Sequence, residues 1–316
     1  MNENKNESKS LRVAYGEALA KLGAVNDRIV VLDADLAHAT MTNLFAEKYP
    51  DRFYNFGVAE ANMVGASAGF AFEGFIPFVS TFALFGAGRA YEIIRNAVAY
   101  SHANVKFAFS HSGLSVGEDG GSHQSVEDIA LMRAIPGMTV FVPCDPLETE
   151  KAVNAAAALN GPVYIRVARP VCPCITGEND PFVPGKAAVL KEGTQAAIFA
   201  TGLMVAEALE AAKLLENEGI SAAVVNFHTI KPFDTQTALE WAQKTGAVVT
   251  VEEHSVIGGL GSAAAEVLAG LAGFRFARIG INDRFGKSGT PKDLFREYGL
   301  TASNIVEKAK ELTRDH

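Results

Sequence analysis

The chain has 316 residues, of which 48% are hydrophobic and 20% charged, a balance typical of a globular protein with room for two domains. Its formal net charge of −8 argues against unaided binding to nucleic acid or to a membrane surface. The polar start MNENKNESKS does not read as a signal peptide, and no apolar run is long enough for a membrane span. We therefore expect a cytoplasmic protein with no nucleic-acid and no membrane partner.

The first half of the chain alternates between two kinds of pattern. After an expected disordered tail at residues 1–10, apolar runs that predict buried strands stand at 28–32, 76–80, 105–110, 138–142 and 162–167. Helical patterns lie between them at 11–22, 41–48, 60–72, 85–100 and 146–159. Such alternation predicts βαβ units and a mainly parallel sheet covered on both faces, over residues 11–170.

A stretch rich in Pro and Gly at 171–187 interrupts the alternation and predicts a linker. Strand and helix patterns then resume, with strands at 196–200, 222–225 and 247–251 and helices at 205–218 and 235–244. We therefore predict an α/β protein with two doubly wound domains, the second at residues 188–316. The turn GGLGSAAAE at 258–266 lacks the full spacing of a dinucleotide fingerprint, so we interpret it as a packing turn and His254 as structural.

The cysteines do not predict a metal site. Cys144, Cys172 and Cys174 are an odd number, which does not suggest a disulfide framework. A zinc site would need more ligands at suitable spacing. We expect three reduced, structural thiols and no metal held by this chain.

Three segments contain the candidate functional residues. FYNFGVAEANMVGASAGFAFEGF begins at Phe53 and contains Glu60, which an ordinary helix start would also explain. STFALF follows, with Phe82 and Phe85, whose usual fate is core packing. The third, HSGLSVGEDGGSHQ, begins at His111. A Gly-rich loop at the carboxyl end of a strand is where open α/β sheets bind ligands.

In this order the segments resemble the pyrimidine-binding domain of the transketolase family, whose cofactor is thiamine diphosphate. The resemblance extends over nearly the whole chain and is densest from Tyr54 to Gln124. It implies that Glu60 contacts the ring nitrogen of the cofactor's aminopyrimidine and drives the proton exchange that activates the cofactor. It also implies that Phe85, with Phe82 beside it, encloses this ring. Asp35 either faces the cofactor or is a plain residue of the turn after a strand.

The resemblance also supplies residues for the sugar. Asp119 matches the family's Asp that bonds the hydroxyl next to the reacting carbon. His111 and His123 match histidines that contact sugar and phosphate oxygens and can move protons. Arg12 and Arg169 match two arginines that hold the substrate phosphate, for which the planar guanidinium is suited. The expected substrates are therefore sugar phosphates.

The chain departs from the family at three positions. Ser112 stands where family members often have Asp. Gly88 stands where another aromatic is frequent, which predicts a wider or differently shaped pocket. Ala39 stands where the family brings a Ser to the phosphate, so the identity of the anionic group is left open.

One half of a thiamine enzyme has no counterpart in the sequence. The Gly-Asp-Gly signature of the diphosphate-binding domain is not present. The resemblance therefore implies the C-terminal subunit of a split transketolase, which transfers a two-carbon ketol unit from a ketose to an aldose. A separate N-terminal subunit would bind the diphosphate through Mg²⁺ or Ca²⁺. The expected assembly is α₂β₂, with self-association of this chain.

Three alternatives stay open at this point. A deoxyxylulose-phosphate synthase-like chain and the β subunit of a 2-oxoacid dehydrogenase are related enzymes with different loops. A catalytically inactive regulatory subunit is the third, against which the retention of Glu60 and Asp119 argues.

Overall fold

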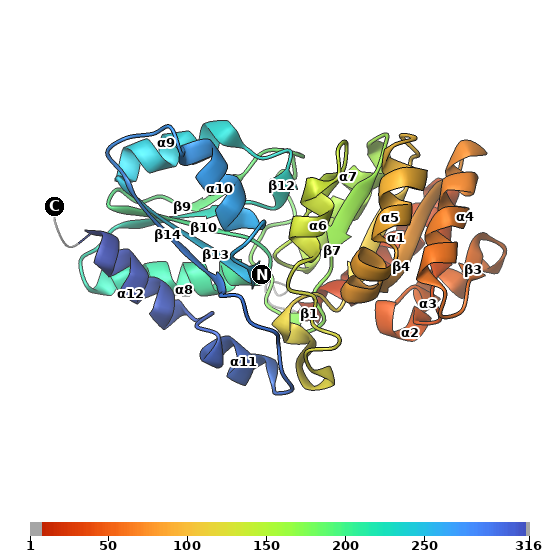
Figure 1. Cartoon of the computed structure of the whole chain (residues 1–316), viewed down its shortest axis with the longest axis horizontal. Coiled ribbons are helices and arrows are strands. Elements are labelled where there is room, and N and C mark those ends of the chain that lie inside the picture. Colours follow the sequence, from red (N-terminus) through yellow and green to blue (C-terminus); the bar gives the residue numbers. More distant parts are fainter. Residues whose placement is uncertain (1–7, 314–316) are drawn as a thin grey trace, which may run out of the picture.

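The computed structural model describes residues 8–313. It consists of two α/β units that lie side by side (Figure 1), and most of their strands are parallel, which confirms the predicted fold class. We predicted a disordered tail at residues 1–10, of which residues 1–7 lie outside the described part of the chain. The prediction is wrong for residues 9 and 10, because β1 (Lys9–Ser10) pairs antiparallel with β8 (Val171–Cys172).

The first unit contains a seven-stranded sheet in the order β12-β6-β7-β5-β4-β2-β3. All its neighbouring strands are parallel except β12 and β6. The strands are β2 (Ile29–Asp33), β3 (Phe53–Asn55), β4 (Ile76–Phe82), β5 (Lys106–Ser110), β6 (Thr139–Phe141), β7 (Val163–Arg166) and β12 (Thr229–Lys231).

Helices cover both faces of this sheet, as the unbroken apolar runs of its strands require. In β2, Ile29 and Val31 pack in one core with α1 (Leu11–Val25) and α7 (Pro146–Ala158). Val30 and Leu32 pack in another core with α4 (Glu60–Phe72) and α6 (Asp128–Ala134). Two short helices, α2 (Ala37–Thr40) and α3 (Asn43–Ala46), follow β2.

The helix predicted at 85–100 is interrupted. A π-helical turn at Phe85–Arg89, the short α5 (Tyr91–Ile93) and a second π-helical turn at Ile94–Ala99 replace it. Gly86 lies against the ring of Phe109, so closely that a Cβ there would clash. Phe82 is the last residue of β4, and Phe85 begins the first π-helical turn.

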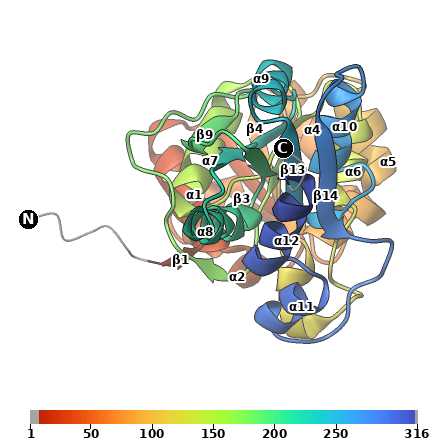
Figure 2. The same ribbon diagram turned by 90° about the vertical axis from the view of Figure 1, so that its left-hand side faces the viewer.

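The second unit contains a five-stranded sheet in the order β14-β13-β10-β11-β9, in which only β9 is antiparallel. Its strands are β9 (Ala188–Lys191), β10 (Ala196–Ala200), β11 (Ala222–Asn226), β13 (Ala247–Ser255) and β14 (Arg275–Ile281). Its helices are α8 (Met204–Asn217), α9 (Thr235–Thr245), α10 (Leu260–Leu268), α11 (Pro291–Glu297) and α12 (Ala302–Thr313). α9 and α10 lie on one face, and α8 and α12 on the other (Figure 2).

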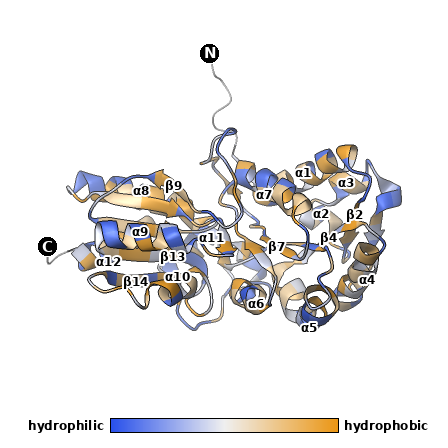
Figure 3. Ribbon diagram, turned by 90° about the horizontal axis from the view of Figure 1, so that it is seen from above, coloured by the Kyte–Doolittle hydropathy of each residue, from blue (hydrophilic) through white to orange (hydrophobic). Residues whose placement is uncertain are grey.

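The two units are joined by a strand and by a common hydrophobic core. β12 comes from the second half of the chain, yet it extends the first sheet. One hydrophobic cluster runs from Val79 of the first sheet to Phe199 of the second. Apolar residues concentrate on the strands inside both units (Figure 3). The division at 170 and 188 therefore stays a prediction, and β12 crosses it. Within residues 8–313, no helix combines the length and apolarity that a membrane crossing needs.

Candidate functional site

Glu60 is the first residue of α4, as the sequence predicted. Glu60 is only 5% exposed. Arg89, which ends the first π-helical turn, donates a hydrogen bond from Nη1 to Glu60 Oε1 at 3.0 Å. The Arg89 guanidinium also lies 4.3 Å from the centre of the Phe85 ring. A buried carboxylate, a guanidinium and an aromatic face thus meet at one place.

Four rings from two of the predicted site segments lie together near this carboxylate. Phe82 and His111 stack with centroids 3.9 Å apart, and Phe82 and Phe85 stack at 5.7 Å. His123 meets Phe85 edge-on at 5.3 Å. These contacts arise because β4 and β5 are parallel neighbours that end at the same edge of the sheet, where Phe82 pairs with Ser110.

His111 is held as a neutral imidazole. It is 3% exposed, and its Nδ1 lies 2.9 Å from Ser110 Oγ. Burial, together with the positive charges of Arg12 and Arg169, lowers the pKa of His111 to about 3. At neutral pH the ring can therefore donate and accept hydrogen bonds, but it carries no charge of its own.

Arg12 and Arg169 come from opposite ends of the first unit and lie near each other. Burial and the charge of Arg169 lower the pKa of Arg12. Arg12 Nη1 donates to Ala39 O at 2.9 Å, while its buried Nε has no hydrogen-bond partner among the described residues. Arg169 Nη1 donates to Val116 O and lies 3.5 Å from Glu118 Oε2. Two guanidiniums that repel each other are suited to an anion placed between them.

Two predicted acids lie at the surface. Asp119 ends the 3₁₀ turn Leu114–Asp119 and is exposed. Asp35 is also exposed, has a left-handed backbone with φ of 67°, and accepts a hydrogen bond from Asn55 Nδ2 at 3.0 Å. Among residues 8–313, neither acid makes a hydrogen bond or ion pair with a residue of the ring cluster. Both therefore remain candidates for contact with a molecule bound at this edge.

Sequence reasoning missed Arg89. It follows Gly88, the position where the resemblance had suggested an aromatic side chain. A Cβ at Gly88 would meet no atom within 4 Å, so the space next to Gly88 is open. Helical spacing could not have paired Arg89 with Glu60, since the two residues lie on different elements 29 positions apart.

The described residues offer no alternative metal centre. Within 8–313, no group of three or more His, Cys, Asp or Glu side chains could hold a metal ion. A cavity of about 490 Å³ lies beneath the linker, where Phe182 stacks on His228 at 4.1 Å. None of the predicted site residues lines this cavity.

Comparisons with known proteins match both halves of the chain. Residues 7–173 match the family described as transketolase, pyrimidine binding domain, and residues 185–305 match transketolase, C-terminal domain. The 6-deoxy-6-sulfo-D-fructose transketolase subunit of Clostridium sp. (strain MSTE9) is 47% identical over 98% of this chain and 97% of its own. Human transketolase is 40% identical over 95% of this chain, which spans only 48% of the human protein.

A solved structure described as a split gene transketolase, inactive beta4 tetramer, has the same fold. Its TM-score is 0.89 at 49% identity, and the match covers 98% of this chain and 99% of that chain. A transketolase from Campylobacter jejuni matches with a TM-score of 0.83 at 27% identity, over 96% of this chain and 46% of that chain.

Proposed function

The chain belongs to the transketolase family, and from this premise we propose that it is the C-terminal subunit of a split transketolase. In this proposal it transfers a two-carbon ketol unit from a ketose to an aldose acceptor. The observation that supports this most strongly is the meeting of Glu60, the Phe82–Phe85–His111–His123 ring cluster and the Arg12–Arg169 pair at one edge of the first sheet. The transketolase names of the relatives favour this reaction over the deoxyxylulose-phosphate synthase and 2-oxoacid dehydrogenase alternatives.

Family membership implies thiamine diphosphate as cofactor, and the residues present fit its pyrimidine end. The Glu60 carboxyl would face a ring nitrogen through the oxygen that Arg89 does not bond, and the planar ring would take the place of the Arg89 guanidinium over Phe85, beside the open space at Gly88. When bound, the cofactor supplies the nucleophilic carbon that breaks and forms the carbon–carbon bond. The chain's own residues bind, orient and hold protons: Glu60 at the ring nitrogen, and His111 and His123 at the sugar oxygens.

A partner is proposed for the diphosphate end. A diphosphate and its divalent cation, Mg²⁺ or Ca²⁺, require oxygen ligands that a separate N-terminal subunit would carry. The exposure of Asp35, Asp119 and much of the Arg89 side chain supports a site that a second subunit covers. We propose an α₂β₂ assembly with self-association of this chain, for which the tetramer described for the split-gene relative is support. A cytoplasmic location stays a prediction.

The decisive test is turnover by the reconstituted enzyme. The chain is mixed with its N-terminal partner, thiamine diphosphate and Mg²⁺, and ketol transfer from a ketose phosphate to an aldose is followed by product analysis. We expect transfer with the mixture and little or none with the chain alone. Turnover of pyruvate with failure on every ketose would contradict the ketol-transfer proposal.

The anion site gives a second prediction. Replacing Arg169 with Ala should raise the KM for a ketose phosphate by roughly 10- to 100-fold, because a hydrogen-bonded ion pair with the substrate is lost. The KM for a non-phosphorylated ketose should stay unchanged. Arg296→Ala is a matched control, since among the described residues its exposed side chain pairs only with Asp293. An equal rise for both ketoses in Arg169→Ala would contradict a role in anion binding.

The chemical nature of the terminal anion is settled by the same assay. Arg12 contacts the backbone oxygen of Ala39, the position where the resemblance had suggested a Ser hydroxyl. The Clostridium relative is named for a sugar with a sulfonate group. Comparing kcat/KM for fructose 6-phosphate and 6-deoxy-6-sulfofructose therefore decides which anion this chain prefers.

A further inference from the structure

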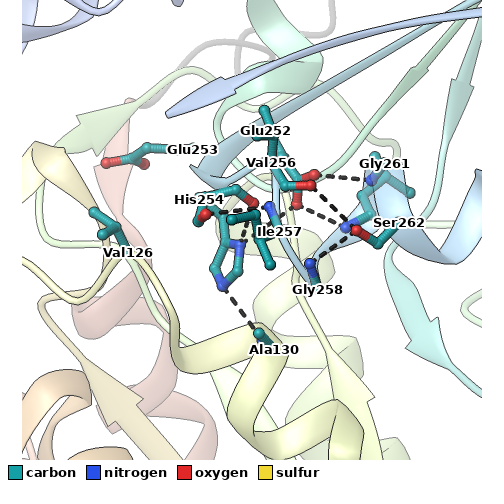
Figure 4. A network of polar contacts seen from close by, with 12 residues as sticks. Val126, Ala130, Glu252, Glu253, His254, Val256, Ile257, Gly258, Gly261 and Ser262 are labelled. Atoms are coloured by element: carbon teal, nitrogen blue, oxygen red, sulfur yellow. Dashed lines mark hydrogen bonds and ion pairs between the residues drawn. The ribbon is translucent and has the colours of Figure 1, made fainter. Parts of the chain in front are cut away.

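Glu253 reaches from the second unit into the first. It lies near the end of β13 and is 2% exposed. The residues before and after it, Glu252 and His254, make different contacts. Glu252 accepts hydrogen bonds from the N–H groups of Leu260 and Gly261 at 2.6 and 2.8 Å and so caps α10. In Figure 4 the Glu253 side chain points away from this network.

The Glu253 side chain contacts the loop His111–His123, which contains three of the predicted sugar-binding residues. Glu253 Oε1 accepts a hydrogen bond from the Ser115 N–H at 2.5 Å. Gly113 has φ of 75°, and a Cβ there would clash with the same carboxylate. The close approach therefore requires glycine at 113, and the carboxylate fixes the start of the 3₁₀ turn that ends at Asp119.

The backbone that carries Glu253 is itself held firmly against the first unit. Arg166 Nη2 donates to Glu253 O at 3.0 Å. The Ser255 N–H donates to Val126 O at 2.7 Å, and the Ala130 N–H donates to His254 Nε2 at 3.3 Å (Figure 4). The carboxylate thus projects from a rigid support.

Placing a carboxyl here is unfavourable. Burial raises the pKa of Glu253 to about 7, although the charge of Arg166 and the hydrogen bonds from Ser115 oppose this shift. Glu253 Oε2 has no hydrogen-bond partner among the described residues. A buried carboxyl that is only half satisfied is a common feature of residues that serve a site rather than stability.

We propose that Glu253 is a positioning residue, which holds the His111–His123 loop in the geometry that binds the sugar. The second unit thereby takes part in substrate recognition without touching the substrate. This inference rests on the proposed function for its effect on the sugar, but the positioning of the loop can be tested without any activity.

The experiment compares Glu253→Met, Glu253→Gln and His254→Ala in the full chain. Hydrogen–deuterium exchange is measured for the amides of residues 112–125, and KM and kcat are measured with the partner subunit, thiamine diphosphate and a ketose phosphate. Glu253→Met keeps the length of the side chain but removes the acceptor. It should speed exchange at Ser115 and raise KM by roughly 10- to 100-fold with a smaller change in kcat.

The other two variants separate positioning from general loosening. Glu253→Gln keeps an acceptor oxygen for Ser115, so it should restore both exchange and KM to near the native values. His254→Ala weakens the same interface at Ala130, and it should leave exchange at 112–125 unchanged. Native exchange in Glu253→Met, or equal acceleration in His254→Ala, would overturn the inference. If no ketol transfer occurs even in the native enzyme, the proposed function fails, while the exchange data still decide the role of Glu253.

Discussion

Replacing Glu60 with Gln is expected to lower the kcat of the reconstituted enzyme by about 100- to 10,000-fold. Gln keeps the size of the side chain, and its oxygen can still accept the hydrogen bond that Arg89 now donates at 3.0 Å. It cannot hold or release the proton that the proposed role at the cofactor ring requires. The loss should therefore appear in kcat, measured under saturating cofactor and ketose.

The control for this variant lies directly after the same helix. Glu73 is the exposed residue that follows α4, so Glu73→Gln should leave kcat unchanged. Assembly with the partner is followed by size-exclusion chromatography, and Glu60→Gln should elute as the native complex does. Turnover near the native rate in Glu60→Gln would refute the role of this carboxyl.

Replacing Asp128 with Asn is expected to lower the free energy of unfolding by about 3–5 kcal/mol, because it leaves a buried arginine without its counter-charge. Asp128 is fully buried and Arg166 is 5% exposed. Their Oδ2 and Nε atoms are 2.8 Å apart, and the Tyr164 hydroxyl donates to the same oxygen at 2.5 Å. Arg166 also donates to Glu253 O, so the loss should loosen the contact between the two units.

Urea-induced unfolding followed by circular dichroism measures this effect. Glu210→Gln is a suitable control, because it breaks an exposed pair with Lys213 on α8, and such pairs contribute little. Stability of Asp128→Asn equal to that of the control would show that the buried pair is not a main support of the interface.

The same variant should change the pH dependence of stability. Burial alone would raise the pKa of Asp128, but the charge of Arg166 and the hydrogen bonds from Arg166 and Tyr164 lower it below the usual value. A carboxyl with a lowered pKa adds stability above its unfolded pKa and loses it as pH falls toward the folded pKa. Native protein should therefore lose stability in acid more steeply than Asp128→Asn does.

Local patterns determined much of what the sequence predicted correctly. Glu60 begins α4 and the strand before His111 ends at Ser110, because apolar runs and helix starts depend on residues close in the chain. The parallel sheet followed from the same alternation. The sequence did not predict β12, because a three-residue strand on the edge of the other unit's sheet leaves almost no pattern in the chain.

Only the tertiary structure decided how the site residues meet. Arg89 ends a π-helical turn that replaces the predicted regular helix, and its hydrogen bond to Glu60 joins residues 29 positions apart, which helical periodicity does not reveal. Glu253 lies 138 positions from Ser115, and its hydrogen bond exists because the two units pack together. The sequence by itself determined the candidate site residues other than Arg89, since their types and local order suffice to propose them. Their distances, charges and the contribution of the second unit depend on contacts between distant segments, which only folding creates.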